Sequence, residues 1–312
     1  MASQQNDRSQ SVPGLVKGAD EDVHPPITGA SAAVRARARR AGDLGSEKGT
    51  RNRANIRRGA QWIALRTLLF KEIHRFLRIW PQTILPAAVT NGLYLVIFGA
   101  LMGNRIGAMG GVSYVDYIVP GITLMSVITN SYSNVVSSFY STKFQRNIEE
   151  LLISPMSEWV ILAGYVGGGI ARGLAVGALV TAIAALFTEL HVTHLGVLLG
   201  MGFLTAALFS LAGFINAVFA NSFDAISIVP NFVLTPLVYL GGVFYSIDLL
   251  PGIWRRFSLG NPILYMVNAF RYGFLGVSDV RIDYAFAIIC GMIMFLAVWA
   301  FVLLRRGTGI KT

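Results

Sequence analysis

The chain has 312 residues, of which 54% are hydrophobic and only 13% are charged. Soluble domains carry about 25% charged residues, so this composition excludes an ordinary soluble protein and indicates an all-α polytopic membrane protein. The net charge of +10 comes mainly from the N-terminal part, because more than half of the Lys and Arg residues precede Pro81. Basic residues beside membrane spans set topology and attract anionic lipid, so they do not indicate a nucleic-acid partner.

The N-terminal part contains two different segments. Residues 1–54 are polar and basic and lack hydrophobic periodicity, which predicts a disordered cytoplasmic tail. The sequence begins without an apolar h-region, so we expect no cleavable signal peptide. In residues 55–81, large apolar residues recur at helical spacing from Trp62 to Trp80, with most Arg and Lys elsewhere on the helical wheel. This pattern predicts an amphipathic helix in the membrane interface, which Pro81 ends.

Six apolar runs follow within residues 82–307, and each is close to the roughly 20 residues that a helix needs to cross a bilayer. Basic residues follow the second run at Lys143 and Arg146 and the sixth run at Arg305. By the positive-inside rule both termini are then cytoplasmic, and residues 308–312 form a short cytoplasmic tail. The six predicted spans are Thr83–Met102, Tyr117–Tyr140, Val160–Phe187, Leu195–Ala220, Ile226–Phe244 and Tyr284–Leu304.

The segment between the fifth and sixth spans does not fit a crossing helix. Residues 245–275 are about half apolar but are broken by Pro251, Gly260 and Pro262. We predict a pair of short re-entrant helices that dip into the outer leaflet and pack against protein. The arginines here, Arg271 among them, are expected to reach the headgroups by snorkelling.

A short amphipathic segment, residues 147–159, lies between the second and third spans and contains a Ser-Pro stop. A loop with one charged face and one apolar face is typical of a docking element for another protein. We therefore predict a helix that couples this chain to a partner. The residues expected at this contact are Arg146, Ile148, Glu149, Glu150, Leu151, Leu152 and Pro155.

Polar residues inside the spans suggest a pathway. Four of them share one face of the second span, where they either bond to neighbouring helices or line a path for a polar headgroup or sugar. A charge inside a span is costly, so Arg172 either pairs with Glu158 or a backbone carbonyl, or belongs to the path. Tyr239 lies among the proline and glycine breaks of the fifth span. The candidate pathway residues are Asn130, Ser133, Asn134, Ser137, Arg172 and Tyr239.

Three further patterns leave their interpretation open or predict no site. Glycines recur every four residues around Gly173, which permits close helix contact either within one subunit or between subunits. His191 and His194 have a spacing that metal ligands use, but no third ligand lies beside them except Glu189, so we predict no metal site. Cys290 is the only cysteine and has no partner for an internal disulfide.

Motifs between residues 240 and 271 resemble the C-terminal signature of the ABC type-2 transporter permease family. The family carries a Gly-aromatic-aromatic turn, Leu-Pro, Trp, Asn-Pro and a closing Arg, and a Pro-Gly early in the second span. The matches here are Gly242, Phe244, Tyr245, Leu250, Pro251, Trp254, Asn261, Pro262 and Arg271, with Pro120 and Gly121. The resemblance covers roughly Trp62 to the C-terminus, and the segment from Phe144 to Leu152 is most similar to the YadH-like bacterial inner-membrane permeases.

The resemblance implies six transmembrane helices per subunit, an N-terminal interface helix, a cytoplasmic coupling helix and re-entrant outer helices, assembled as a homodimer in the bacterial inner membrane. It implies an ATP-driven exporter of an amphipathic or polar substrate, such as a lipid, glycolipid, polysaccharide or drug. ATP and Mg would be held by two copies of a separate ABC ATP-binding subunit, since this sequence contains no GxxxxGK[ST] phosphate loop and we expect no cofactor on this chain. The expected outer gate comprises Phe244, Tyr245, Pro251, Trp254, Asn261, Pro262 and Arg271.

Two other function classes can be compared with this one. A membrane-embedded lipid-modifying enzyme would need converging carboxylates or a His–acid pair, but Glu149 and Glu150 are adjacent and point apart, so we predict no catalytic residue. An ion-coupled secondary carrier would use acids inside the spans or paired broken helices, and the predicted span interiors contain no acid.

Overall fold

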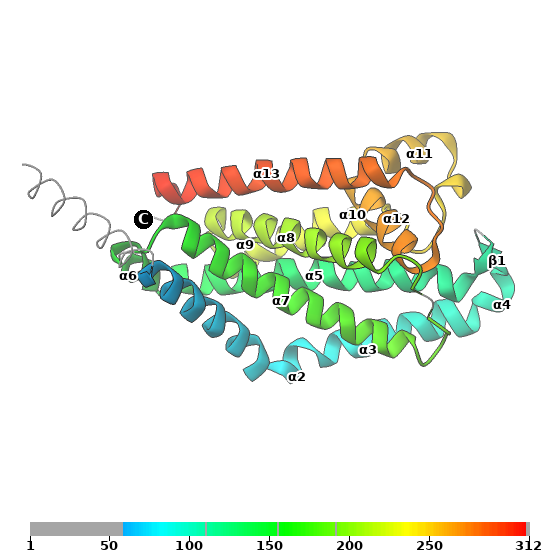
Figure 1. Cartoon of the computed structure of the whole chain (residues 1–312), viewed down its shortest axis with the longest axis horizontal. Helices are drawn as coiled ribbons and strands as arrows, with labels where there is room; N and C mark the ends of the chain where they lie inside the picture. Colours follow the sequence, from blue (N-terminus) through cyan, green and yellow to red (C-terminus); the bar gives the residue numbers. More distant parts are fainter. Residues whose placement is uncertain (1–58, 110, 155, 191, 310–312) are drawn as a thin grey trace, which may run out of the picture. The chain divides into compact units, whose positions relative to one another are not determined.

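A computed structural model describes residues 59–309 except 110, 155 and 191, all within one unit of the chain, residues 57–312. This part is almost wholly helical (Figure 1). Its first helix covers residues 59–78 and is named the amphipathic helix below. The later elements are α2 (Trp80–Thr83), α3 (Leu85–Tyr94), the π-helix η1 (Leu95–Leu101), α4 (Gly103–Ile106), β1 (Ala108–Met109), β2 (Val112–Ser113), α5 (Tyr114–Phe144), α6 (Asn147–Ile153), α7 (Glu158–Ala184), α8 (Leu195–Phe219), α9 (Phe223–Val229), the π-helix η2 (Pro230–Leu234), α10 (Thr235–Tyr239), the 3-10 helix η3 (Ile247–Leu249), α11 (Gly252–Leu259), α12 (Pro262–Leu275) and α13 (Ile282–Arg306).

The helices begin and end where the sequence supplies caps and breaks. The Ser113 hydroxyl accepts a hydrogen bond from the backbone N–H of Asp116 at 3.3 Å and so caps α5. Asn261 caps α12 in the same way. At its other end α12 stops at Gly276, whose φ of 72° is left-handed, a conformation that glycine adopts without strain.

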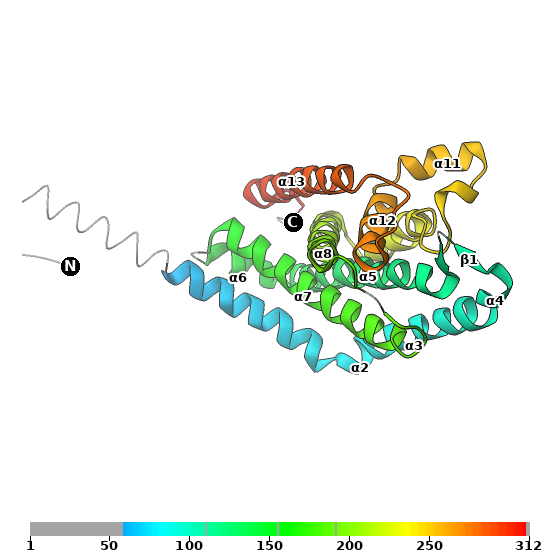
Figure 2. The same ribbon diagram turned by 45° about the vertical axis from the view of Figure 1, so that its right-hand side comes forward.

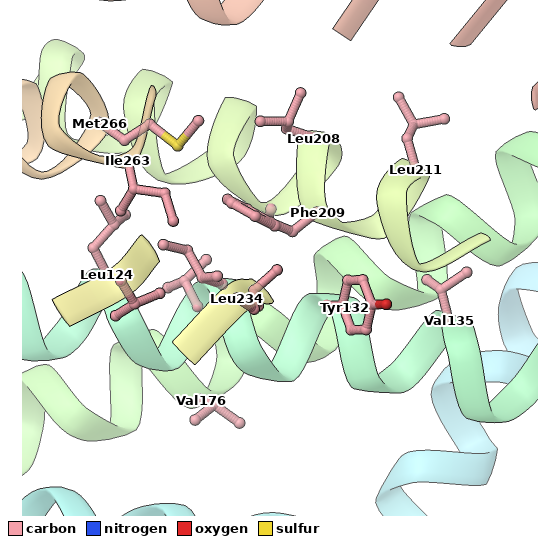
Figure 3. Packing of buried hydrophobic residues seen from close by; sticks show 14 of the residues in the cluster. Leu124, Tyr132, Val135, Val176, Leu208, Phe209, Leu211, Leu234, Ile263 and Met266 are labelled. Carbon is pink, nitrogen blue, oxygen red and sulfur yellow. The ribbon is translucent and has the colours of Figure 1, made fainter. Parts of the chain in front are cut away.

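Helix α5 lies at the centre of the packing, with α7 and α8 against it and with α12 and α13 against α8 (Figures 1 and 2). Both views place α6 and the C-terminal end of α13 at one end of the bundle, named the α6 end. They place α4, β1 and α11 at the opposite end, named the α11 end. The core between α5, α8 and α12 is filled by interlocking apolar side chains, such as Leu124, Phe209 and Met266 (Figure 3).

The glycine ladder of α7 packs against helices of the same chain. A Cβ at Gly173 would lie 3.2 Å from the carbonyl oxygen of Val127 and would collide with the Ser131 hydroxyl, so α5 approaches as closely as two backbones allow. A Cβ at Gly168 would lie 2.5 Å from Cβ of Glu72 in the amphipathic helix. Of the two interpretations left open by the sequence, packing within one subunit is therefore the one found at these glycines.

Four helices of the described residues are long and apolar enough to cross a membrane: Trp80–Gly99, Glu158–Ala184, Leu195–Phe219 and Ile282–Arg306. They correspond to the first, third, fourth and sixth predicted spans. Helix α5 has 31 residues, but its polar residues lower its hydropathy. The continuous helix Phe223–Tyr239 is apolar but shorter than the other four. The molecule is thus an all-α polytopic membrane protein, and four helices in the part of the chain that the structure describes meet both criteria.

Several predicted boundaries differ from the structure, including the following three. The fifth predicted span continued to Phe244, but α10 ends at Tyr239 because Gly242 follows in a left-handed turn with φ of 73°. Helix α6 ends at Ile153 rather than continuing to residue 159. The amphipathic helix ends at residue 78, before Pro81, which falls in the first turn of α2.

Candidate transport cavity and coupling surface

A cavity of about 400 Å³ lies between α3, α5, α7 and α10. Its walls include four of the six predicted pathway residues: Asn130 and Ser133 from α5, Arg172 from α7 and Tyr239 from α10. The remaining lining residues are Gln82, Thr83, Pro86, Ala87, Thr90, Asn91, Tyr94, Met125, Ser126, Thr129, Thr235 and Val238. The fold therefore collects hydroxyl, amide and guanidinium groups from distant parts of the chain around one space.

Arg172 lies near the middle of α7 and faces this cavity. Its Nη2 donates to Oδ1 of Asn130 at 3.3 Å, while its Nε is buried and has no hydrogen-bond partner among the described residues. The predicted pair with Glu158 is not formed, because that residue begins α7 about four helical turns earlier. Arg172 is thus held by a neutral amide and not by a carboxylate.

The two other predicted pathway residues face elsewhere. Asn134 is fully buried and accepts a hydrogen bond from Nη2 of Arg75 through Oδ1 at 2.8 Å. The Ser137 hydroxyl donates to the carbonyl of Ser133 at 2.7 Å, within its own helix. Neither residue lines the cavity. The polar face of α5 is therefore divided between the cavity and the amphipathic helix.

A buried acid joins the amphipathic helix to α5. Glu72 is 1% exposed, its Oε1 accepts from the Ser138 hydroxyl at 2.8 Å, and its Oε2 pairs with Arg75 at 3.2 Å. Arg75 then donates to both oxygens of Asn134. We name these four residues the α5 lock. Sequence reasoning placed Arg75 on the polar face and overlooked Glu72, although Glu72 is the only acid between residues 59 and 78.

Aromatic rings form one wall of the cavity. The hydroxyls of Tyr94 and Tyr239 lie 3.3 Å apart, which is a hydrogen-bond distance. Phe244 packs against both rings, with centroids at 5.8 and 5.9 Å, and Phe98 packs against Phe244 at 4.9 Å. This aromatic cluster brings the predicted gate residue Phe244 beside the predicted pathway residue Tyr239.

The predicted gate residue Arg271 is buried within the protein, with 1% exposure, so the prediction that it snorkels to the headgroups is wrong. Its Nη2 donates to the carbonyl of Gly242 at 2.7 Å, and its Nε donates to the carbonyl of Tyr117 at 3.2 Å. The guanidinium also lies 3.8 Å from the centroid of the Tyr117 ring, a cation–π contact. Arg271 thus ties α12 to α5 and to the turn after α10.

An acid that sequence reasoning overlooked completes this arrangement. Oδ2 of Asp279 accepts from the Ser246 hydroxyl at 2.9 Å and from the Tyr117 hydroxyl at 3.4 Å. Its backbone N–H donates to Asn268, which also accepts from Arg271 at 3.5 Å. The segment before α13 is therefore fixed to the same hub as the turn that carries Phe244. Asp279 stands outside every motif that the sequence analysis used, so no signal marked it.

The other predicted gate residues lie in α11, at the start of α12 and in the segment before α11, and their role as a gate stays a prediction. Pro251 is the N-cap residue of α11, and Trp254 on that helix is 51% exposed. Asn261 donates through Nδ2 to the carbonyl of Leu237 at 2.6 Å, and Pro262 occupies the first turn of α12. The Tyr245 hydroxyl is buried and has no hydrogen-bond partner in the described part of the chain.

The predicted coupling residues occupy the α6 end. Arg146 has a left-handed φ of 60°, and this strained residue turns the chain from α5 into α6. Glu149 and Glu150 are exposed, but Ile148 is 4% exposed and packs into the core, which differs from its predicted place on the docking face. The exposed apolar residue of α6 is instead Ile153, at 84%. Pro155 and the side chains of Leu151 and Leu152 lie outside the described residues.

Lys143 attaches this end of α5 to α8. Its Nζ donates to the carbonyls of Val218 and Ala220 at 2.8 and 2.9 Å, where α8 ends. Burial lowers the pKa of the Lys143 ammonium from its ordinary value. Lys143, which the sequence analysis used as a topology signal, therefore also caps the C-terminal end of α8.

The described residues contain no group of three or more metal-ligating side chains. His194 stacks on the Tyr272 ring with a centroid distance of 4.6 Å. Its predicted neighbour His191 lies outside the described residues. His194 therefore makes an aromatic contact, and the absence of a metal site stays a prediction.

Comparison with known proteins identifies the class to which this fold and cavity belong. The model of the ABC-2 type transporter family matches residues 63–275, more than half of the chain, so the chain belongs to this family. It is a membrane-spanning permease subunit of an ABC transporter and not an enzyme, and members of the family work with an ABC ATP-binding partner.

Individual relatives place it more closely. Over 254 residues the chain is 56% identical to the inner membrane transport permease YadH of Escherichia coli (strain K12), a match that covers 80% of this chain and 98% of the relative. It is 23% identical over 232 residues to nodulation protein J of Rhizobium leguminosarum bv. viciae, covering 73% of this chain and 90% of that protein. The first similarity and the apolar helices make this a multi-pass protein of the inner membrane.

Proposed function

We propose that this chain moves an amphipathic or polar substrate outward across the inner membrane as the permease subunit of an ATP-driven exporter. The observation that carries the proposal is the cavity, because it gathers Asn130, Arg172 and Tyr239 from three helices around one space. Polar groups are costly inside a membrane, and they are kept where they line a path or a binding site.

The test is reconstitution of the permease with its ATP-binding subunit in lipid vesicles. Lipids, glycolipids, polysaccharides and hydrophobic drugs are added in turn, and both ATP hydrolysis and movement of the compound are measured. We expect one class to stimulate hydrolysis and to cross the bilayer in the export direction. Movement in the import direction, or movement without ATP, would overturn the proposal.

We propose that each subunit has six membrane-spanning helices. The four long apolar helices are joined by α5, which is long enough to cross, and by the helix Phe223–Tyr239, while α11 and α12 re-enter from the outer side. Both termini are then cytoplasmic, since Lys143, Arg146 and Arg305 gather at the α6 end.

Single cysteines test this topology in a Cys290→Ser background. Arg255 on α11 has a 53% exposed side chain, and Thr308 follows α13 in an exposed turn. We expect Arg255→Cys to react with an impermeant maleimide from outside and Thr308→Cys only from inside. Reaction of both from one side would contradict the six-span arrangement.

The α6 end is the proposed contact with the ATP-binding subunit, which holds ATP and Mg. Exposed Glu149, Glu150 and Ile153 offer two charges beside an apolar side chain, which is the composition of a docking patch. We expect Ile153→Asp and Glu150→Lys to release the ATPase during copurification while the permease still inserts. Leu186→Asp is the control, because Leu186 is 83% exposed just beyond the opposite end of α7. Unchanged copurification and coupled turnover in both α6 variants would contradict the assignment.

Two copies of this chain are proposed to pair with two ATPase subunits, since closed two-fold symmetry is the usual solution for such an assembly. The substrate path then lies between the copies. Tyr239 is 43% exposed, so Tyr239→Cys is expected to cross-link to the other copy and to stop transport without stopping nucleotide binding. A monomer that transports in lipid with its ATPase bound would refute the pairing.

No specific observation favours the two other function classes. The family assignment excludes the lipid-modifying enzyme. An ion-coupled carrier needs an acid that titrates inside the membrane. Glu72 is the only acid of the described residues that lies away from helix ends and loops, and both of its oxygens are already bonded in the α5 lock.

A further inference from the structure

Arg172 carries a positive charge into the middle of α7, and none of the residues that line the cavity is acidic. Arginine stays protonated in proteins, so the charge is not removed by loss of a proton. A charge at this depth is costly unless it is paired. The contact with Asn130 supplies one neutral acceptor and no countercharge.

The nearest charged groups do not balance Arg172. Arg75 interacts electrostatically with it and is a second cation, so its effect is repulsive. Glu72 forms its ion pair with Arg75, and its other oxygen accepts from Ser138. The α5 lock is therefore neutral by itself and leaves Arg172 unpaired.

A second copy of the chain would not supply the missing anion from a helix centre. Apart from Glu72, every acid of the described residues lies in a loop or in the first turns of a helix. These acids are Asp116, Glu149, Glu150, Glu158, Glu189, Asp224, Asp248, Asp279 and Asp283. A molecule that enters the cavity is therefore a candidate source of the countercharge.

The rest of the cavity fits such a molecule. Several other polar groups of its wall are already satisfied within the chain, for example Ser126, which donates to Asn91 at 2.8 Å. Among the buried side-chain atoms of the lining residues, as far as the structure describes the chain, Nε of Arg172 is a donor without a hydrogen-bond partner. Beside the cavity, α3 and η2 carry exposed apolar residues, including Val89 and Phe232. A polar anion site next to an apolar surface matches a molecule with both characters.

We propose that the cavity binds the oxyanion group, a phosphate or carboxylate, of an amphipathic substrate, and that Arg172 is the residue that binds it. The inference rests on the proposed export function, since it names the substrate class of that site. Arg172 donates charge-assisted hydrogen bonds to the anion, Asn130 holds the guanidinium in position, and the apolar tail lies along α3 and η2.

Native mass spectrometry of the full chain in a neutral detergent tests the proposal without the ATPase. Dioctanoyl phosphatidic acid, dioctanoyl phosphatidylcholine and inorganic phosphate are titrated separately, and phosphate is then used as a competitor. We expect at least about tenfold tighter binding of phosphatidic acid than of phosphatidylcholine, which corresponds to about 1.4 kcal/mol. Competition by phosphate assigns the site to the oxyanion alone, and its absence assigns it to the whole amphiphile; both support the proposal.

Three variants make the test specific. Arg172→Gln is expected to abolish the preference for phosphatidic acid, and Asn130→Asp to weaken it, because the new carboxylate pairs with Arg172. Arg281→Gln removes an arginine whose side chain is 70% exposed and is expected to leave the preference unchanged.

Equal binding of the two lipids by the wild type, or a preference that survives both cavity variants, overturns the proposal. If Arg172→Gln does not fold, Asn130→Asp decides. This experiment measures binding alone. A negative result therefore overturns the anion-binding proposal without overturning the permease assignment. Failure of the proposed ATPase contact, in turn, does not affect the binding result.

Discussion

Replacing Glu72 by Gln is expected to loosen the amphipathic helix from α5. In the native protein the carboxylate is 1% exposed, accepts from Ser138 at 2.8 Å and pairs with Arg75 at 3.2 Å. The amide keeps the shape and one acceptor but removes the charge. Arg75 is then left with only the oxygens of Asn134 as partners among the described residues.

The structure sets the size of the effect. A hydrogen bond to a charged group contributes about 1.5–3 kcal/mol. The Arg75 side chain is 29% exposed, so solvent screens part of the interaction and the lower half of this range applies. A loss of about 1.5–2 kcal/mol in local stability corresponds to roughly ten- to thirtyfold faster opening of the helix.

Hydrogen exchange of residues 59–78 in the detergent-solubilised permease measures this opening. Arg78→Gln removes an exposed charge from the same helix and is expected to leave exchange unchanged. The double variant Glu72→Gln with Arg75→Gln is expected to exchange more slowly than the two single effects predict, because no unpaired charge is left. Additive effects within about 0.5 kcal/mol, or wild-type exchange in Glu72→Gln, would refute the reasoning.

Two further predictions concern packing. Arg271→Gln removes the donor to the carbonyls of Tyr117 and Gly242 and is expected to destabilise the permease by about 2–4 kcal/mol. The control Arg255→Gln, on the surface of α11, is expected to have little effect. Equal stability of the two variants in thermal unfolding would contradict the role of Arg271 in tying these elements together. Gly173→Ala places a methyl group against Ser131 and Val127 and is expected to lower the free energy of unfolding by about 1–3 kcal/mol. In Gly196→Ala the new methyl group meets open space, so the free energy of unfolding is expected to change by less than about 0.5 kcal/mol. Unchanged stability of Gly173→Ala would show that α5 and α7 can move apart.

The sequence predicted the helices well where a local signal marks them. Composition and periodicity located the long apolar helices, whereas the caps at Ser113 and Gly307 were not predicted. The fifth span was misplaced at one end because an apolar run continues through residues 240–244 while the backbone turns at Gly242. Hydropathy describes how apolar each residue is, but it does not show where the backbone turns.

The candidate site was predictable only in part, because its groups meet through tertiary packing. Arg172 was marked by its position in an apolar run, but its partner Asn130 depends on how α5 faces α7. Ile148 was assigned to a docking face because helical periodicity does not tell an inward apolar face from an outward one. Glu72 contacts Ser138, 66 residues away in the chain, and Asp279 contacts Tyr117, 162 residues away, and no local pattern encodes such contacts.

Helix α5 takes part in polar contacts along most of its length. From the α6 end to the α11 end it offers Lys143 to the end of α8, Ser138 to Glu72, Asn130 to Arg172 and the carbonyl of Tyr117 to Arg271. The glycines of α7 allow so close an approach that a rotation of α5 must move side chains on both sides. If α6 contacts the ATP-binding subunit as we propose, a displacement at α6 would be passed to α5 through the strained residue Arg146, and α5 lines the cavity.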